Sequence, residues 1–386
     1  MLNFNFHNPV KILFGEGKVS ELAQNIPTGA KVLMTYGGGS IKRNGVYEQV
    51  KEALQDYEVL EFSGIEANPH YETAIKAVDL IQKEKVDFLL AVGGGSVVDA
   101  TKFMAAAAFY AGDEPWDIIA KGVTVEKALP LGVVLTLPAT GTEMNKNAVL
   151  TRQSTQEKMA FYSPHVMPQF SVLDPTFTYS LPKRQVMNGI VDAFVHVLEQ
   201  YMTYPVDSPV QDRFSEGLML TLIEEGRKAM QLSSPDYNNR ANIAWAATMA
   251  LNGIIASGVK ECWATHKIGH ELTAFHGLDH ALTLAIVLPG FMNVVKDRRQ
   301  EKLLQLAERV WGITEGSEDE ILSALIDQTE KFFRELGMKT RLSEHGITQN
   351  TIDKIVARFK ARGFEKLPLL EDVSVDEIAL ILGQRL

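Results

Sequence analysis

The pattern of apolar and polar positions changes in character halfway along the chain. In the first half, three short apolar runs, at 31–36, 86–92 and 131–138, are each followed by a turn rich in glycine or threonine. The segments 46–55 and 71–85 between them carry apolar residues three and four positions apart, as amphipathic helices do. Strands that alternate with helices pair in parallel through crossover connections. The first half therefore predicts an open α/β sheet.

From Pro182 onward the periodicity is almost entirely helical, in long stretches at 184–202, 210–230, 240–254, 300–311 and 319–337. We place the domain boundary near residue 180, in the proline-bearing stretch LDPTFTYSLPKR. Residues 1–180 are then predicted to form a Rossmann-like α/β domain, and residues 181–386 an all-α domain. The longest uncharged run, Ala241 to Val259, reaches the length of a membrane span. Its asparagine, serine and glycine residues favour a buried helix instead.

The charge balance narrows the possible partners. The chain has 38 basic and 48 acidic residues, a net charge of −10. This excludes a generally basic nucleic-acid binder, because such proteins neutralise phosphates with clustered lysine and arginine, but it leaves room for a local phosphate pocket. The single cysteine, Cys262, excludes an intrachain disulfide and suits a reducing compartment. Because the first residues carry no export signal, we expect a cytoplasmic protein with no membrane or nucleic-acid partner.

Two glycine-rich loops each follow an apolar strand and precede a predicted helix. The first is Gly37, Gly38, Gly39 and Ser40; the second contains Gly94, Gly95 and Ser96, with Asp99 in the helix that follows. At such a junction, backbone N–H groups at the helix N-terminus point toward an anion, and glycine lets the ligand approach the backbone. One such loop could be an ordinary tight turn. Two at the same end of one sheet favour a dinucleotide phosphate site.

The first loop also bears on the choice of dinucleotide. NAD-selective sites usually place an acid after the strand to bind the ribose 2′-hydroxyl. Here the loop is followed by Lys42 and Arg43, and no carboxylate stands there. These cations could be a solvated helix start. We favour NADP, whose 2′-phosphate needs neutral or basic neighbours.

A second group of residues has the chemistry of a metal site. Asp192 and His196 stand four positions apart in a helical pattern, so they project from one face. Four of the nine histidines fall within fifteen residues: His266, His270, His276 and His280. One carboxylate and several imidazoles suit a borderline divalent cation such as Zn²⁺ or Fe²⁺. A single histidine is more often an ordinary core residue, and the spacing does not say which three of these histidines bind.

Four segments resemble those of the iron-containing (group III) alcohol dehydrogenases, most of all the branch of NADPH-dependent aldehyde reductases and butanol dehydrogenases. The segments are GGGSVVDATK, LPATGTE, DAFVHVLEQY and HKIGHELTAFHGLDH, and the similarity extends over nearly the whole chain. The resemblance implies a dehydroquinate synthase-like fold and a homodimer.

The resemblance also implies roles for individual residues. The metal aspartate falls on Asp192, and the three metal histidines fall on His196, His266 and His280; the histidine beside the nicotinamide falls on His270. Some close members carry tyrosine where this chain has Phe177, so a contact through that hydroxyl is missing here. The NADPH contacts fall on Gly38, Ser40, Asn68, Gly95, Ser96, Asp99, Thr136, Thr140, Asn145 and Lys158.

Two residues have a plain alternative interpretation. Lys158 stands in TRQSTQEKMAFYS, which predicts a hairpin, so it is either a cofactor contact or an exposed turn lysine. Cys262 stands four residues before His266, which predicts a position on the same helical face. We interpret Cys262 as a small buried apolar side chain.

Together these features predict a metal-dependent, NADP(H)-linked alcohol dehydrogenase or aldehyde reductase for small to medium aldehydes and primary alcohols. The metal would act as a Lewis acid without a redox role. The proton donor is left open among His270, a cofactor hydroxyl and water, and so is the choice between iron and zinc. Two alternatives are an NAD-linked polyol dehydrogenase of the same fold and a non-catalytic nucleotide-binding protein.

Overall fold

A parallel sheet of six strands forms the centre of the N-terminal half in the computed structural model, which describes residues 1–386. Its strand order is β1-β8-β5-β4-β2-β3, and every neighbouring pair is parallel. The register pairs Val32 with Phe88, and Leu89 with Leu131. The strands are β1 (Lys11–Phe14), β2 (Val32–Tyr36), β3 (Val59–Phe62), β4 (Phe88–Gly94), β5 (Leu131–Leu137) and β8 (Phe170–Leu173).

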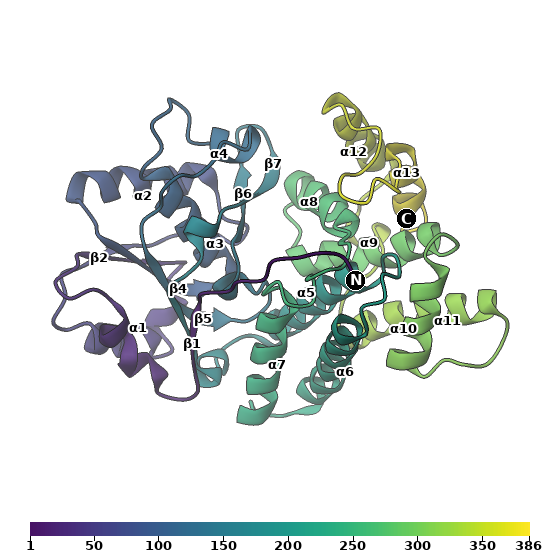
Figure 1. Cartoon of the computed structure of the whole chain (residues 1–386), viewed down its shortest axis with the longest axis horizontal. Helices are drawn as coiled ribbons and strands as arrows, with labels where there is room; N and C mark the ends of the chain where they lie inside the picture. The colour runs from purple at the N-terminus through teal and green to yellow at the C-terminus, as the bar shows by residue number, and fades with distance from the viewer. The chain divides into compact units, whose positions relative to one another are not determined.

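Helices cover both faces of this sheet (Figure 1). Alternate residues of β2 enter two different cores. Leu33 packs with α2 (Tyr71–Glu84) and α3 (Gly95–Ala107), whereas Met34 packs with α1 (Val46–Ala53). Because both faces of the central strands β2, β4 and β5 are buried, these strands are apolar at nearly every position, which confirms the three strands predicted from apolar runs.

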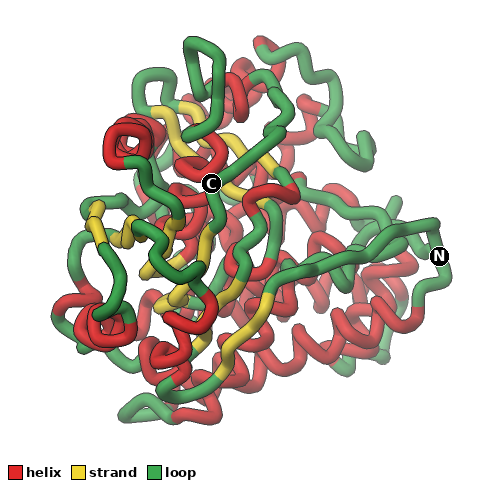
Figure 2. Tube along the Cα trace, turned by 60° about the vertical axis from the view of Figure 1, so that its left-hand side comes forward, coloured by secondary structure: helices red, strands yellow, loops and turns green.

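An antiparallel hairpin, β6 (Asn147–Arg152) and β7 (Glu157–Tyr162), completes the β structure and confirms the predicted hairpin around Lys158. All eight strands, yellow in Figure 2, precede residue 174. Two further helices, α4 (Asp117–Ala120) and α7 (Tyr237–Ala250), belong to the same part of the structure.

The chain forms two compact units, each built from more than one segment. The sheet unit comprises residues 7–186 and 233–252, and the helical unit comprises residues 1–6, 187–232 and 253–386. Within the sheet unit, Trp245 of α7 lies edge-on to Phe14, with ring centroids 5.9 Å apart. The boundary near residue 180 stays a prediction, while the contacts assign α7, which lies beyond it in sequence, to the sheet unit.

The helical unit contains no strand, which agrees with the predicted periodicity. No helix of the chain combines the length and the apolar character that a membrane crossing needs. Its helices are α5 (Lys183–Tyr201), whose first residues belong to the sheet unit, α6 (Pro209–Gln231), α8 (Ala264–His276), α9 (His280–Val295), α10 (Gln300–Trp311), α11 (Glu318–Glu335), α12 (Gln349–Ala361) and α13 (Val375–Gly383).

Three local predictions need correction. The uncharged run from Ala241 is helical only to Ala250, where α7 ends, and the chain then forms turns. The first glycine loop leads into a single 3-10 turn, Ser40–Lys42, before α1 begins at Val46. Cys262 is buried as predicted, but it precedes α8 and does not share a helical face with His266.

Candidate active site

Three helices of the helical unit bring one carboxylate and three imidazoles together. Asp192 and His196 lie one turn apart on α5, His266 lies in the first turn of α8, and His280 is the first residue of α9. Asp192 Oδ1 lies 3.6 Å from Nε2 of His196, 3.9 Å from Nε2 of His266 and 3.6 Å from Nε2 of His280. The four ligand atoms all lie within 4.8 Å of one another.

This donor set fits a divalent metal ion. Tetrahedral sites with metal–ligand bonds of about 2.0–2.2 Å hold their ligand atoms roughly 3.3–3.6 Å apart, close to the separations found here. His266 Nε2 is buried and has no hydrogen-bond partner, a cost that a bound ion would remove. Burial alone lowers the pKa of His266, but the nearby carboxylates of Asp192 and Glu199 outweigh burial and raise that pKa to about 9. The pocket therefore attracts positive charge.

The two remaining histidines of the C-terminal group lie in different surroundings. The His270 ring is half-buried, with its centroid 5.4 Å from that of His280, but His270 does not supply an atom to the four-residue group. His276, the last residue of α8, is exposed, and its Nε2 lies 3.0 Å from the hydroxyl of Thr351. Among the four clustered histidines, geometry thus separates His266 and His280 from the other two.

In the sheet unit, the predicted cofactor loops follow neighbouring parallel strands. Gly37 to Ser40 follow β2, Gly94 to Ser96 join β4 to α3, and Thr136 lies near the end of β5. β2, β4 and β5 are neighbours in the sheet, so these positions share its carboxyl edge. A Cβ built on Gly95 would lie 2.7 Å from the hydroxyl of Thr140, so only glycine allows this approach of the two loops. The structure brings the three loops together.

A second pair of predicted cofactor residues meets at the hairpin. Lys158 is only 7% exposed, and its Nζ donates a hydrogen bond to Oδ1 of Asn68 at 2.9 Å. The alternative of an exposed turn lysine is therefore wrong. Asn68 adopts a left-handed backbone, with φ 54°, before α2 begins. Phe177, at the position that departs from the family, is buried in the core beside α1.

The first loop has a carboxylate neighbour that the sequence did not reveal. Glu61 of β3 lies 3.5 Å from the Nζ of Lys42 and accepts hydrogen bonds from the hydroxyls of Tyr36, at 2.8 Å, and Tyr47, at 2.6 Å. The Lys42 ammonium also lies over both tyrosine rings. Hydrogen bonding to Tyr36, with a smaller contribution from Glu61, raises the pKa of Lys42. No acid follows this loop in the sequence, but in the folded protein Glu61 lies beside it. The expectation of a loop without a carboxylate neighbour is thus wrong.

Beneath the second loop lies a buried polar network that sequence reasoning missed. Both oxygens of Asp99 are occupied inside the protein, by the hydroxyl of Thr142 at 2.7 Å and the backbone N–H of Val149 at 3.0 Å. Lys102, fully buried one helical turn later, donates to Thr142 and to the Oδ1 and carbonyl oxygen of Asn145. Burial lowers the pKa of Lys102 to about 7. The sequence signal for this network was the Asp-x-x-Lys spacing of Asp99 and Lys102 in the segment GGGSVVDATK.

Comparison with known proteins confirms the resemblance. The family model described as "Iron-containing alcohol dehydrogenase" matches residues 9–175, and "Fe-containing alcohol dehydrogenase family, C-terminal" matches residues 186–382. The chain is 55% identical over 378 residues to the NADPH-dependent aldehyde reductase YqhD of Escherichia coli, covering 97% of each chain. It is 42% identical to a probable NADH-dependent butanol dehydrogenase of Bacillus subtilis, covering 94% of this chain and 95% of the relative.

The fold agrees with these sequence matches. The crystal structure of E. coli YqhD superimposes with a TM-score of 0.98 and 53% identity, covering 100% of this chain and 99% of that one. Together with the two family models, this shows that the chain belongs to the iron-containing alcohol dehydrogenase family.

Proposed function

We propose that this protein is a metal-dependent, NADP(H)-linked alcohol dehydrogenase and aldehyde reductase acting on small to medium aldehydes and primary alcohols. The observation that carries the proposal is the convergence of one carboxylate oxygen and three imidazole nitrogens in the helical unit. Family membership supports the reaction class. The two relatives compared above are named for different cofactors, NADPH and NADH, so the choice of dinucleotide depends on this chain's own residues.

We propose Asp192, His196, His266 and His280 as the ligands of one divalent ion, iron or zinc, since both accept this donor set. When bound, such an ion supplies a Lewis acid that polarises the carbonyl oxygen of an aldehyde. With one anionic group among four donors, these residues leave part of the ion's charge uncompensated. That suits a site in which an alkoxide must be stabilised.

The sheet unit would hold the dinucleotide, which supplies the hydride when bound. The start of α3 at Gly95 and Ser96 offers backbone N–H groups to its phosphates, as helix N-termini do. The proposed contact residues are Gly37, Gly38, Gly39, Ser40, Lys42, Asn68, Gly94, Gly95, Ser96, Asp99, Thr136, Thr140, Asn145 and Lys158.

Local charge supports NADP as the dinucleotide. Beside the first loop, Glu61 is shared by two tyrosine hydroxyls and by the ammonium groups of Lys42 and Lys51, at 3.5 and 3.7 Å. Two cations thus face one carboxylate, and a third cation, Arg43, follows Lys42 in the sequence. The excess of positive charge attracts a 2′-phosphate. Glu61 already accepts hydrogen bonds from two tyrosines, so it is not free to accept one from a ribose hydroxyl.

Cofactor oxidation with butanal tests this function directly. We expect the metal-loaded protein to reduce butanal with a kcat/KM for NADPH at least about tenfold above that for NADH. This margin corresponds to roughly 1.4 kcal/mol of preferential binding. A preference for NADH, combined with faster oxidation of glycerol or a diol than of butanol, would instead establish the NAD-linked polyol dehydrogenase.

His270 is proposed to act on the substrate without binding the metal, because its ring lies beside His280 but outside the four-residue group. We expect His270→Gln to lower kcat by roughly 10²-fold, the lower range for general acid–base catalysis, while metal content stays at the wild-type level. The measurements are butanal reduction and metal analysis of the same sample. Exposed His276, changed to Gln, is the control with expected wild-type kinetics. Wild-type kcat in the His270 variant would remove this residue from the mechanism.

We also propose a cytoplasmic homodimer. The buried free thiol of Cys262 suits a reducing compartment. Leu2, Phe4 and Phe6 alternate along the N-terminal segment with 44, 49 and 46% of their surfaces exposed, an apolar strip of the kind that marks protein contacts. Sedimentation velocity of the purified protein would detect the dimer, and a single monomer species at micromolar concentration would refute it.

A further inference from the structure

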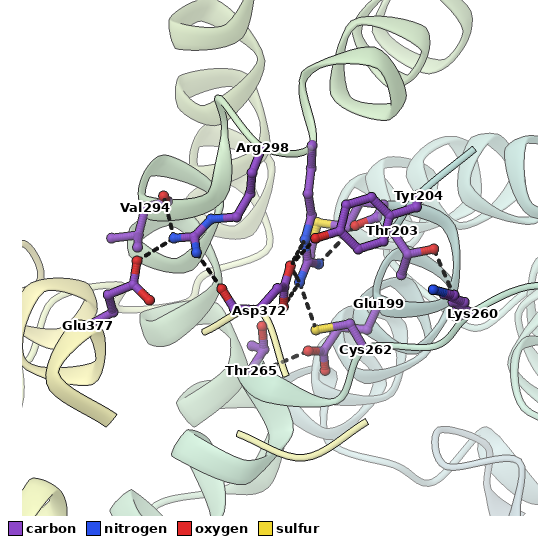
Figure 3. Close-up of polar contacts among 12 residues, drawn as sticks. Glu199, Thr203, Tyr204, Lys260, Cys262, Thr265, Val294, Arg298, Asp372 and Glu377 are labelled. Carbon is purple, nitrogen blue, oxygen red and sulfur yellow. Dashed lines mark hydrogen bonds and ion pairs between the residues drawn. The ribbon is translucent and has the colours of Figure 1, made fainter. Parts of the chain in front are cut away.

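The first turn of α8, which carries His266, is held by a carboxylate from another helix. The first N–H groups of a helix have no partner within it, and the residue preceding α8, Trp263, offers no side-chain cap. Glu199 of α5 takes this place. Its Oε1 accepts from the N–H of Thr265 at 2.7 Å (Figure 3). Its Oε2 accepts from the N–H of His266 at 3.2 Å. Glu199 is completely buried.

The same carboxylate also hydrogen-bonds Nδ1 of His266. Because an ionised carboxylate can only accept, Nδ1 must carry the proton that faces it. In the neutral imidazole, Nε2 is then the nitrogen with the free lone pair. Nε2 is the atom that faces Asp192 Oδ1 and has no hydrogen-bond partner. Glu199 therefore selects the tautomer of His266 that can bind a cation.

Helix geometry explains why one helix does both jobs. Asp192, His196 and Glu199 stand at positions i, i+4 and i+7 of α5, so they lie on one face. This face presents two of the proposed ligands and the support of the third.

A second layer of contacts anchors the segment that leads into α8. The N–H of Cys262 donates to the backbone oxygen of Glu199 at 2.9 Å. The buried guanidinium of Arg299 donates to Cys262 Sγ at 3.4 Å and pairs with Asp372 at 2.8 Å. Cys262 and Asp372 are labelled in Figure 3. Arg299 also donates to the carbonyl of Met202, directly beyond α5. Arg299 thus links the end of α5 to the segment before α8, and this link holds the start of α8 near Glu199.

We propose that Glu199 is a positioning residue for the metal centre: it orients His266, holds it in the tautomer with an unprotonated Nε2, and thereby sets the affinity for the divalent ion. This inference rests on the proposed metal-dependent function. Partners that bind the outer nitrogen of a metal histidine typically change metal affinity by 10–100-fold when removed. Glu199 has the contacts of such a partner.

Zn²⁺ affinity of the full-length protein, measured by competition with a chromophoric chelator, tests the proposal without using turnover. In Glu199→Gln, one oxygen becomes an amide donor that favours the opposite tautomer of His266, so we expect 10–100-fold weaker Zn²⁺ binding. Glu199→Asp keeps a group that only accepts but shortens its reach, and its affinity should fall between those of wild type and Glu199→Gln. Co²⁺ absorption spectra of the same variants report the ligand geometry independently.

Glu271→Gln is the matched control. Glu271 is a buried carboxylate, 3% exposed, on α8, the helix that carries His266. It pairs with Arg358 at 2.9 Å and Arg362 at 2.6 Å. We expect it to lower thermal stability but to leave Zn²⁺ affinity within about threefold of wild type. Wild-type affinity in Glu199→Gln, a weaker affinity in Glu199→Asp than in Glu199→Gln, or an equal loss in Glu271→Gln would overturn the role of Glu199. Failure of the wild-type protein to bind any divalent ion would overturn the proposed function as well.

Discussion

His266→Ala and His280→Ala are each expected to reduce butanal turnover to background and to lower the metal that purifies with the protein. Each change removes one of four donors whose ligand atoms converge within 4.8 Å. The expected loss of affinity exceeds the 10–100-fold typical of losing only an outer partner. Metal analysis of anaerobically purified protein, paired with kcat measurements, checks both effects.

The control for this experiment is His276→Ala. His276 belongs to the same sequence cluster, but it is exposed and bonded to Thr351. Its replacement should leave metal occupancy near the wild-type level. Full metal content in His280→Ala would contradict the proposed ligand set, whatever its activity.

Gly39→Asp is expected to lower the efficiency with NADPH by at least about tenfold and to leave NADH unchanged or improved. The change places a carboxylate where we propose that the 2′-phosphate lies. Two unit charges about 4 Å apart repel by roughly 4 kcal/mol at an effective dielectric of 20. A third of that, about 1.4 kcal/mol, is already tenfold in binding. The loss should appear mainly in the KM for NADPH, because the 2′-phosphate is remote from the transferred hydride.

The control variant for Gly39→Asp must tolerate the backbone conformation of Gly39. Its φ of +85° is left-handed, and a Cβ there would meet no atom within 4 Å. Aspartate and asparagine tolerate this conformation better than most residues, so Gly39→Asn carries the same strain without the charge. NADPH preference should survive in Gly39→Asn. If it also survives in Gly39→Asp, the first glycine loop does not face the 2′ position.

The sequence alone determined the features that depend on short-range pattern. Buried parallel strands are apolar on both faces, so β2, β4 and β5 could be recognised as apolar runs. The helical period placed Asp192 and His196 on one face. The glycine loops and the histidine cluster were visible as motifs because they are contiguous in the chain. The family's pattern selected the same histidines that geometry later brought together.

Spacing by itself left His276 and His280 equivalent, and the tertiary structure separated them. α8 ends at His276, the chain turns over Gly277 to Asp279, and α9 begins at His280 beside His266. The ring centroids of His266 and His280 then lie 5.2 Å apart. A tight turn between two helices decides this, and turn geometry follows from packing as much as from the residues in the turn.

The remaining features depend on residues far apart in sequence, which only packing brings together. Lys158 is buried because Asn68, 90 positions earlier, meets it across the fold. Glu61 reaches the first glycine loop because β3 lies beside β2 in the sheet. In the sequence, Glu199 is one polar position of an amphipathic helix. Its proposed role in orienting His266 depends on the packing of α8 against it. Local pattern determines which residues face inward, but the partners of a buried polar group follow from tertiary contacts.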